Sequence, residues 1–174
     1  MPALIVYATT EGHTRKIAEF VGAALPGSTV VDSANLPPDL DLSQYDAFIL
    51  AGSLHQEKHQ ASLEHFAKNN AAALSVKPSM LLSSSLSANG DADDLAGARK
   101  CADKFAESTG WEPTEIHCVA GALLYTQYDF LKRFLMKMIV KSHGGNTDTS
   151  QDYEYTNWDE LKQIVRQFAA AHSI

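Results

Sequence analysis

The chain has 174 residues, of which 45% are hydrophobic and 20% are charged, and its formal net charge at pH 7 is −7. This composition is typical of a globular protein, and the length predicts a single domain over residues 1–174. The negative charge argues against nucleic acid as a partner, because binding to a phosphate backbone requires a basic face.

Runs with the pattern of buried strands alternate along the chain with stretches that have helical periodicity. The predicted strands cover residues 3–8, 28–32, 46–53, 79–86 and 115–125, and the predicted helices cover residues 13–25, 61–74, 93–109 and 157–172, with one more helix within 129–145. Asn157 and Glu160 have the spacing of a capping box at the start of the last helix. Two helices are expected to turn these apolar residues inward: Ile17, Phe20, Val21, Ala24 and Leu25 in the first, and Leu95, Ala98, Ala102, Phe105 and Ala106 in the third.

Five strands that alternate with helices predict an α/β fold with a doubly wound parallel sheet covered on both faces. Right-handed crossovers favour the strand order 2-1-3-4-5. One connection departs from this pattern, because residues 124–156 form a long insert with its own helix between strand 5 and the last helix. Connections of about 2–6 residues are usual there, and long ones are commonly functional.

Ligands of such sheets bind beyond the carboxyl ends of the strands, so the loops after strands 1, 3, 4 and 5 are the candidates for a site. After strand 1 the sequence is "ATTEGHTRK", in which hydroxyl side chains and Gly12 precede a helix. Free amides at a helix N-terminus favour a phosphate group, and neither a Walker loop nor a dinucleotide fingerprint is present. The predicted phosphate-binding residues are Thr9, Thr10, Glu11, Gly12, His13 and Thr14.

The other three loops are rich in small residues, which permit the close approach of a flat ring with hydrogen-bonding edges. Flavin mononucleotide (FMN) satisfies both requirements, with its phosphate in the first loop and its ring among the others. The residues expected around the ring are Ser53, Leu54, His55, Ser84, Ser85, Leu86, Gly121 and Ala122, with Tyr125 as a stacking group. No residue stands out as a general base.

A metal site is not expected. His55 and His59 are four residues apart, but the HExxH pattern is missing and solvated or packed histidines are the simpler interpretation. The chain has two cysteines without a CxxC spacing, and it begins with the strand-like "PALIVYA", which lacks the features of a signal peptide. We therefore expect a cytoplasmic protein. No pattern indicates an oligomeric state.

With these residues in view, the chain resembles the flavodoxin superfamily and, within it, the menaquinone-dependent protoporphyrinogen oxidases. The superfamily resemblance rests on "TTEGHT" and the order of strands and helices. The narrower one rests on "AGALLY" before the insert, "GGNTDT" after its helix and "YTNW" at the start of the last helix. It implies FMN as a hydride relay that oxidises protoporphyrinogen IX to protoporphyrin IX in haem biosynthesis and passes the electrons to a membrane quinone.

Three alternatives stay open. An electron-carrier flavodoxin would have acids and aromatic residues around the ring, whereas the loops after strands 3 and 5 carry only Glu57 and Asp129 as acids. An NAD(P)H:quinone reductase of the same fold would need a nicotinamide pocket, which the sequence does not show. The third alternative is a module without FMN that serves in a protein interaction.

The helix within residues 129–145 is basic and apolar in an otherwise acidic chain. Its cations are Lys132, Arg133, Lys137 and Lys141, and they lie beside a broad apolar face. A helix packed on the domain with a solvated lysine edge would show this pattern, and so would an interfacial helix. Our hypothesis is that these cations form part of a substrate rim or bring this end of the protein to the membrane surface, and the sequence leaves both alternatives open beside the packed helix.

Overall fold

The fold is built around a five-stranded parallel sheet, seen in a computed structural model that describes residues 2–127, 129–142 and 144–174, without the side chains of residues 130–132, 134, 135 and 142. The strand order is β2-β1-β3-β4-β5, which confirms the predicted order. The strands are β1 (Ala3–Ala8), β2 (Thr29–Asp32), β3 (Ala47–Ser53), β4 (Ser79–Ser85) and β5 (Glu115–Ala120). All four neighbouring pairs are parallel.

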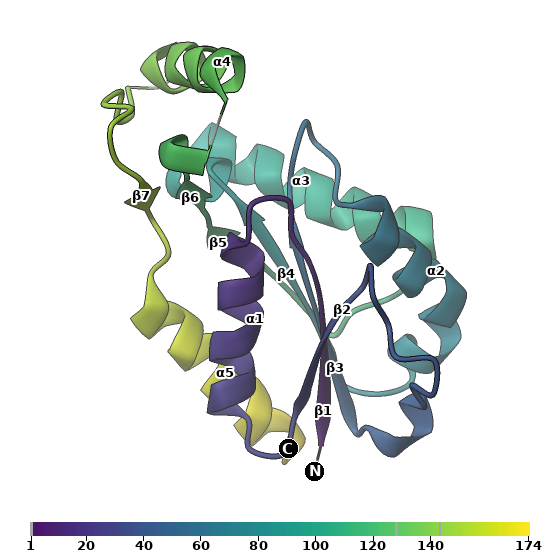
Figure 1. Ribbon diagram of the computed structural model, residues 1–174. Coiled ribbons are helices and arrows are strands. Elements are labelled where there is room, and N and C mark those ends of the chain that lie inside the picture. The colour runs from purple at the N-terminus through teal and green to yellow at the C-terminus, as the bar shows by residue number, and fades with distance from the viewer. Residues whose placement is uncertain (1, 128, 143) are drawn as a thin grey trace.

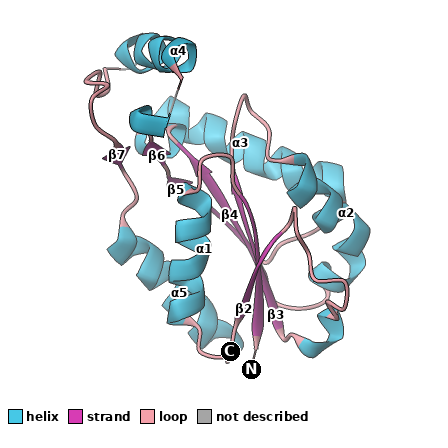
Figure 2. Cartoon of the chain, in the orientation of Figure 1, coloured by secondary structure: helices cyan, strands magenta, loops and turns pink. Residues whose placement is uncertain are grey.

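Helices cover both faces of this sheet (Figures 1 and 2). The α-helices are α1 (His13–Ala24), α2 (Ala61–Ser75), α3 (Ala92–Thr109), α4 (Phe130–Ser142) and α5 (Trp158–His172). Three short 3-10 helices are η1 (Leu42–Gln44), η2 (Ser87–Asn89) and η3 (Tyr125–Gln127). Helices α1 and α5 lie on one face, and α2 and α3 lie on the other (Figure 1).

Strand β1 divides the core into two layers, because successive side chains of a strand point to opposite faces. Ile5 packs with Ile17 and Val165 of α1 and α5. Leu4 belongs to the opposite cluster, with Leu63 and Phe105 of α2 and α3. The inward face predicted for α1 is largely confirmed, whereas Leu95 of α3 is 45% exposed. Leu95 lies in the first turn of α3, where this side of the helix has no cover.

The fifth predicted strand, 115–125, is interrupted at Gly121. Strand β5 ends at Ala120, and the short strand β6 (Ala122–Leu123) leaves the main sheet to pair antiparallel with β7 (Tyr153–Glu154). The Gly121 N–H still donates to Ser85 O at 2.9 Å, so the chain turns away only after this residue. The insert therefore begins and ends on its own two-stranded ribbon.

Helix α4 lies beyond the carboxyl ends of the main strands and apart from the helices that cover the sheet (Figure 1). Among the described residues, α4 packs against the rest of the protein in a small apolar cluster, where Val140 and Met136 contact Leu123 and Tyr125. The helix leaves Met138 and Ile139 58% and 52% exposed. One side of α4 is thus fixed to the protein, and another side presents apolar residues to solvent.

Candidate functional site

The four predicted loops meet at one edge of the sheet because the parallel strands end in register. Ala8 lies beside Gly52, Ser53 beside Ser84, and Ser85 beside Ala120. The Leu54 N–H donates to Ser84 O at 2.8 Å and extends this alignment past the end of β3. The structure therefore brings the starts of all four loops together.

The loop after β1 presents backbone amides at the start of α1. Gly12 has φ = +89°, a conformation that glycine adopts without strain, and its N–H donates to Thr9 Oγ1 at 2.9 Å. Thr10 is exposed, Glu11 is half-buried, and Thr14 is buried in the first turn of α1. No acidic residue lies in that turn. The positive end of the helix dipole suits an anion here.

The side chain of His13 points away from this loop. Its Nε2 lies 2.7 Å from Thr156 Oγ1, and its Nδ1 lies 3.7 Å from Glu154 Oε2. Burial lowers the pKa of His13 below its ordinary value, although Glu154 acts in the opposite direction. The imidazole is therefore neutral at pH 7, so the contribution predicted for His13 to anion binding falls to its backbone.

Gln60, the residue before α2, joins the loops after β1 and β3. Its Nε2 donates to Thr10 Oγ1 at 3.0 Å and to Ser53 Oγ. Its Oε1 is buried and has no hydrogen-bond partner among the described residues. A buried acceptor of this kind suits a ligand that offers an N–H group. The sequence prediction missed Gln60, because its partners lie 7 and 50 residues away.

The loop after β3 is a tight turn that holds its side chains at the rim. The backbones of His55 and Lys58 pair with each other, and Gln56 and Glu57 have φ values of +49° and +63°. Ser53 and Leu54 are half-buried, and His55 is exposed. An apolar side chain and an imidazole are thus available beside the loop after β1.

The loop after β4 contributes mainly backbone and one apolar side chain. Ser84 and Ser85 are buried, and Ser85 Oγ accepts a hydrogen bond from the Ala88 N–H at 3.2 Å. Leu86 is half-buried at the edge. A Cβ on Gly121 would lie 3.2 Å from Ser84 Oγ and 3.4 Å from Ser85 C, so a larger residue here would press against the loop after β4. Ala122, next in the chain, is half-buried.

The stacking role predicted for Tyr125 is not supported by its position. The ring is completely buried, and its hydroxyl donates to Asn146 O at 3.0 Å. Tyr153 packs edge-on against it, with ring centroids 6.2 Å apart. A ring covered on all sides cannot lie against a ligand, so Tyr125 packs inside the insert and stabilises it.

The two histidines of the predicted pair lie in different surroundings. His59 is buried, and its Nε2 lies 3.0 Å from Ser83 Oγ, while His55 is exposed. Burial lowers the pKa of His59 to about 4. Within residues 2–127, 129–142 and 144–174, no group of three or more potential ligands could hold a metal ion.

The cations predicted to line a rim lie on α4. Lys137 and Lys141 are exposed and Arg133 is half-buried, whereas the side chain of Lys132 lies outside the described residues. The exposed lysines flank the exposed Met138 and Ile139. No helix among the described residues is long and apolar enough to cross a membrane.

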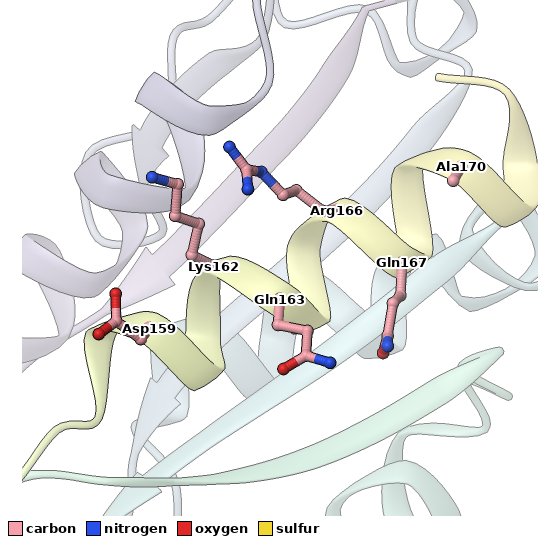
Figure 3. A pocket seen from close by; sticks show the side chains of 6 residues that line it. All are labelled: Asp159, Lys162, Gln163, Arg166, Gln167 and Ala170. Carbon is pink, nitrogen blue, oxygen red and sulfur yellow. The ribbon is translucent and has the colours of Figure 1, made fainter.

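Of two hollows on the described surface that we compared with these loops, one lies near them. One, of about 470 Å³, is lined by α5 alone, through Asp159, Lys162, Gln163, Arg166, Gln167 and Ala170 (Figure 3). Side chains from a single helix provide no opposing wall, so this is helix surface. The other, of about 360 Å³, lies between Leu86, the start of α3 and the end of α4.

Comparison with known proteins places this geometry in a family. The Flavodoxin domain family matches residues 4–150. Among solved structures, a flavodoxin mutant from Pseudomonas aeruginosa covers 100% of both chains with a TM-score of 0.60 at 14% identity. A flavoprotein from Lactobacillus acidophilus, solved in complex with FMN, has a TM-score of 0.52 at 12% identity over 67% of this chain and 92% of its own. These two structural similarities show that the chain has a flavodoxin-like fold.

Two relatives with more similar sequences bear the same name, "Protoporphyrinogen IX dehydrogenase [quinone]". The protein of Escherichia coli (strain K12) is 30% identical over 172 residues, which are 97% of this chain and 95% of the relative. The protein of Leishmania major is 30% identical over 171 residues, or 96% of this chain and 74% of the relative. The chain therefore belongs to the flavodoxin family and, within it, to the family of the protoporphyrinogen IX dehydrogenases.

Proposed function

We propose that this protein is an FMN-dependent enzyme that oxidises protoporphyrinogen IX to protoporphyrin IX in haem biosynthesis, with menaquinone or a related quinone as the electron acceptor. The observation that carries the proposal is the 30% identity to named protoporphyrinogen IX dehydrogenases over 97% of this chain. A match of that extent takes in most of the insert, residues 124–156, which an ordinary flavodoxin sheet does not need.

The residues at the carboxyl edge fit an FMN molecule. The amides and hydroxyls of residues 9–14 would hold the phosphate at the N-terminus of α1. Leu54, His55 and Leu86 would lie around the flavin ring, and the buried Gln60 Oε1 would accept a hydrogen bond from its edge. The flavin would supply two-electron redox chemistry, while the chain binds and orients the reactants.

The chain's own residues favour an enzyme over an electron carrier. Glu57, the acid in the loop after β3, sits at the exposed tip of that turn. Leu54 and Leu86 are the half-buried apolar residues of the ring loops, and Asp94, at the start of α3, shares a cavity wall with Leu86. An edge with these apolar side chains suits an organic substrate better than the charged surface of a redox partner protein.

The activity is tested with purified protein reconstituted with FMN. We expect a yellow protein that oxidises protoporphyrinogen IX and reduces a soluble menaquinone analogue, with the flavin and porphyrin followed by their absorbance. Rapid reduction of the flavin by NADPH, without any response to the porphyrinogen, would reject the proposal in favour of an NAD(P)H:quinone reductase.

Gln60 provides a test of the cofactor site. The change Gln60→Leu removes the amide that joins Thr10 and Ser53 and the acceptor expected for the flavin, so FMN affinity should fall about 3- to 10-fold, as expected for one or two hydrogen bonds. Gln163→Leu, on the exposed surface of α5, is the matched control and should bind FMN like the wild type. Equal affinities in a flavin-fluorescence titration would contradict the assigned site.

We also propose that α4 brings the protein to the cytoplasmic face of the membrane, where the quinone resides. Exposed Met138 and Ile139 between exposed Lys137 and Lys141 form the surface expected of an interfacial helix. Each cation near an anionic leaflet contributes about 1 kcal/mol. The remainder of the acidic protein is repelled, so this surface would orient the site toward the lipid.

Liposome sedimentation tests this orientation. Replacing Lys137 and Lys141 with Gln should lower the partition coefficient on vesicles with anionic lipid about 30-fold at low salt, since about 2 kcal/mol of attraction is lost. Lys100 and Lys104, two exposed lysines four residues apart on α3, provide the control pair. Equal binding of the two double variants would reject a membrane role for α4.

A further inference from the structure

We propose that the cavity of about 360 Å³ between the loop after β4 and the end of α4 is the binding site for the quinone ring, separate from the site of the porphyrinogen. This inference rests on the proposed function, because it assigns one of the two substrates of that reaction to a place in the fold. Nothing in the names of the relatives says where either substrate binds.

The position of the cavity connects the predicted flavin site with α4. Leu86, one of its wall residues, also belongs to the loop expected around the flavin ring. On the opposite side the wall is formed by Ile139 and Val140 of α4. Val140 is buried, whereas Ile139 is 52% exposed, so the cavity reaches the surface beside the exposed apolar residues of that helix. An isoprenoid tail that leaves the cavity there would meet the membrane-facing side of α4.

The size of the cavity favours a small ring system. Its volume lies at the lower end of the range of about 300–1,000 Å³ that small-molecule sites span. A two-ring quinone headgroup fits within such a space, whereas a tetrapyrrole macrocycle with its side chains requires the upper part of that range. The porphyrinogen would therefore occupy the open rim near Leu54 and His55.

The charge of the lining points in the same direction. Asp94 is the only charged residue among the described residues that line the cavity, and the apolar part of the wall includes Leu86, Leu123, Ile139 and Val140. A carboxylate at this position repels the propionate groups of a porphyrinogen but has no such effect on an uncharged quinone. The lining thus disfavours the porphyrinogen and is compatible with the quinone.

Tyr155 adds a hydroxyl group to a wall that also contains the polar residues Ser87, Asn89 and Asn146. Its hydroxyl oxygen accepts from Asn146 Nδ2 at 3.1 Å, and its own proton has no acceptor among the described residues. Quinone carbonyls accept hydrogen bonds and cannot donate them, so a free hydroxyl proton matches their chemistry. The ring of Tyr155 is held by stacking on Tyr153, with centroids 6.5 Å apart and planes 12° apart. The donor is therefore fixed at the wall before a ligand arrives.

Equilibrium dialysis of the FMN-loaded protein with menadione, a soluble naphthoquinone, tests the assignment without turnover. Ile139→Trp should fill the mouth of the cavity and weaken menadione binding at least tenfold. Tyr155→Phe should weaken it about fivefold, as expected for the loss of one hydrogen bond. Leu95→Trp, another exposed aliphatic residue on a neighbouring helix and outside the lining, is the matched control and should bind menadione like the wild type.

The affinity for protoporphyrinogen, measured anaerobically with the same variants, separates the two substrates. Unchanged porphyrinogen affinity in Ile139→Trp, together with weakened menadione binding, supports the quinone assignment. Weakened porphyrinogen binding with unchanged menadione binding would overturn it, and so would menadione affinities that are equal in Ile139→Trp and Leu95→Trp. A protein that binds menadione in this cavity but never oxidises porphyrinogen would refute the proposed function and leave the quinone site standing.

Discussion

Acid should destabilise this protein through a single buried imidazole, His59. The ring is only 8% exposed, and it lies 4.8 Å from the ring of Phe105 beneath the end of β3. Burial lowers its pKa to about 4. Because this value is lower than the unfolded-state pKa of about 6.5, the neutral ring stabilises the fold fully above that pH. The contribution is lost progressively as the pH falls from 6.5 toward 4.

The magnitude follows from proton linkage. At pH 5 the unfolded imidazole is almost fully protonated and the folded one is almost fully neutral, which corresponds to a loss of about 2 kcal/mol relative to pH 7.5. The change His59→Gln removes the titrating group and keeps a side chain that can donate to Ser83 Oγ, its present partner at 3.0 Å. The variant should therefore lose about 2 kcal/mol less stability than the wild type between the two pH values.

Urea denaturation at pH 7.5 and pH 5.0, followed by tryptophan fluorescence, measures this difference. Other titrating groups, His13 among them, contribute equally to both proteins and cancel in the comparison. His65→Gln, at an exposed position of α2, should keep the wild-type pH dependence. If His59→Gln loses as much stability as the wild type between the two pH values, the reasoning from burial is refuted.

Two further predictions concern the start of α1 and the start of α5. Gly12→Ala forces a side chain into a left-handed backbone at φ = +89°. We expect the free energy of unfolding, measured by thermal unfolding, to fall by roughly 1–2 kcal/mol, and FMN binding, measured by fluorescence titration, to weaken. Unchanged values would mean that the loop relaxes without cost. Asn157→Ala removes the side-chain oxygen that accepts from the Glu160 N–H at 3.1 Å, so stability should fall by about 1 kcal/mol and the Tm by about 2–4 °C. Asn157→Asp, which keeps a capping oxygen, should melt near the wild type, and an equal drop in both variants would contradict a capping role.

The sheet was predictable because its determinants are local. The apolar run from Ala3 to Ala8 and the alternation of strands and helices follow from burial on both faces, which a single sequence displays. The break at Gly121 was not predictable in this way. Its cause is the pairing of Ala122 and Leu123 with residues 153 and 154, about 30 positions later, and nothing in "AGALLY" itself distinguishes a strand that continues from one that leaves the sheet.

The site shows the same division between local and distant causes. Loop positions at the carboxyl edge followed from the topology, and Gly121 followed from the need for close approach. The roles of Gln60 and Tyr125 could not be predicted from the topology. Gln60 depends on a hydrogen bond to Thr10, and Tyr125 depends on its burial under the insert. Side-chain direction in a loop is fixed by partners that lie far away in the sequence, and residue type alone does not identify them.

The segment that joins β7 to α5 ties the insert to the main sheet and to α1. The Tyr155 N–H donates to Gly121 O at 3.0 Å, and Thr156 Oγ1 donates to Ala120 O at 2.6 Å. Since the single Thr156 proton is used there, the 2.7 Å contact with His13 requires His13 Nε2 to be the donor. These bonds tie the end of the insert both to β5 and to the first turn of α1.

Glu154 adds hydrogen bonds with a charged and an aromatic partner to these contacts. It accepts from Lys16 Nζ at 2.5 Å and from Trp158 Nε1 at 2.7 Å, and the Lys16 cation lies 5.5 Å from the centre of the Trp158 ring. A partly exposed ion pair alone contributes only about 0–1 kcal/mol, so the fixed position comes from the combined network and not from the salt bridge. The end of the insert and the loop predicted to bind phosphate are therefore held by the same residues. If the quinone binds beside α4, as we propose, these bonds fix the end of the insert relative to the loop expected to bind the FMN phosphate.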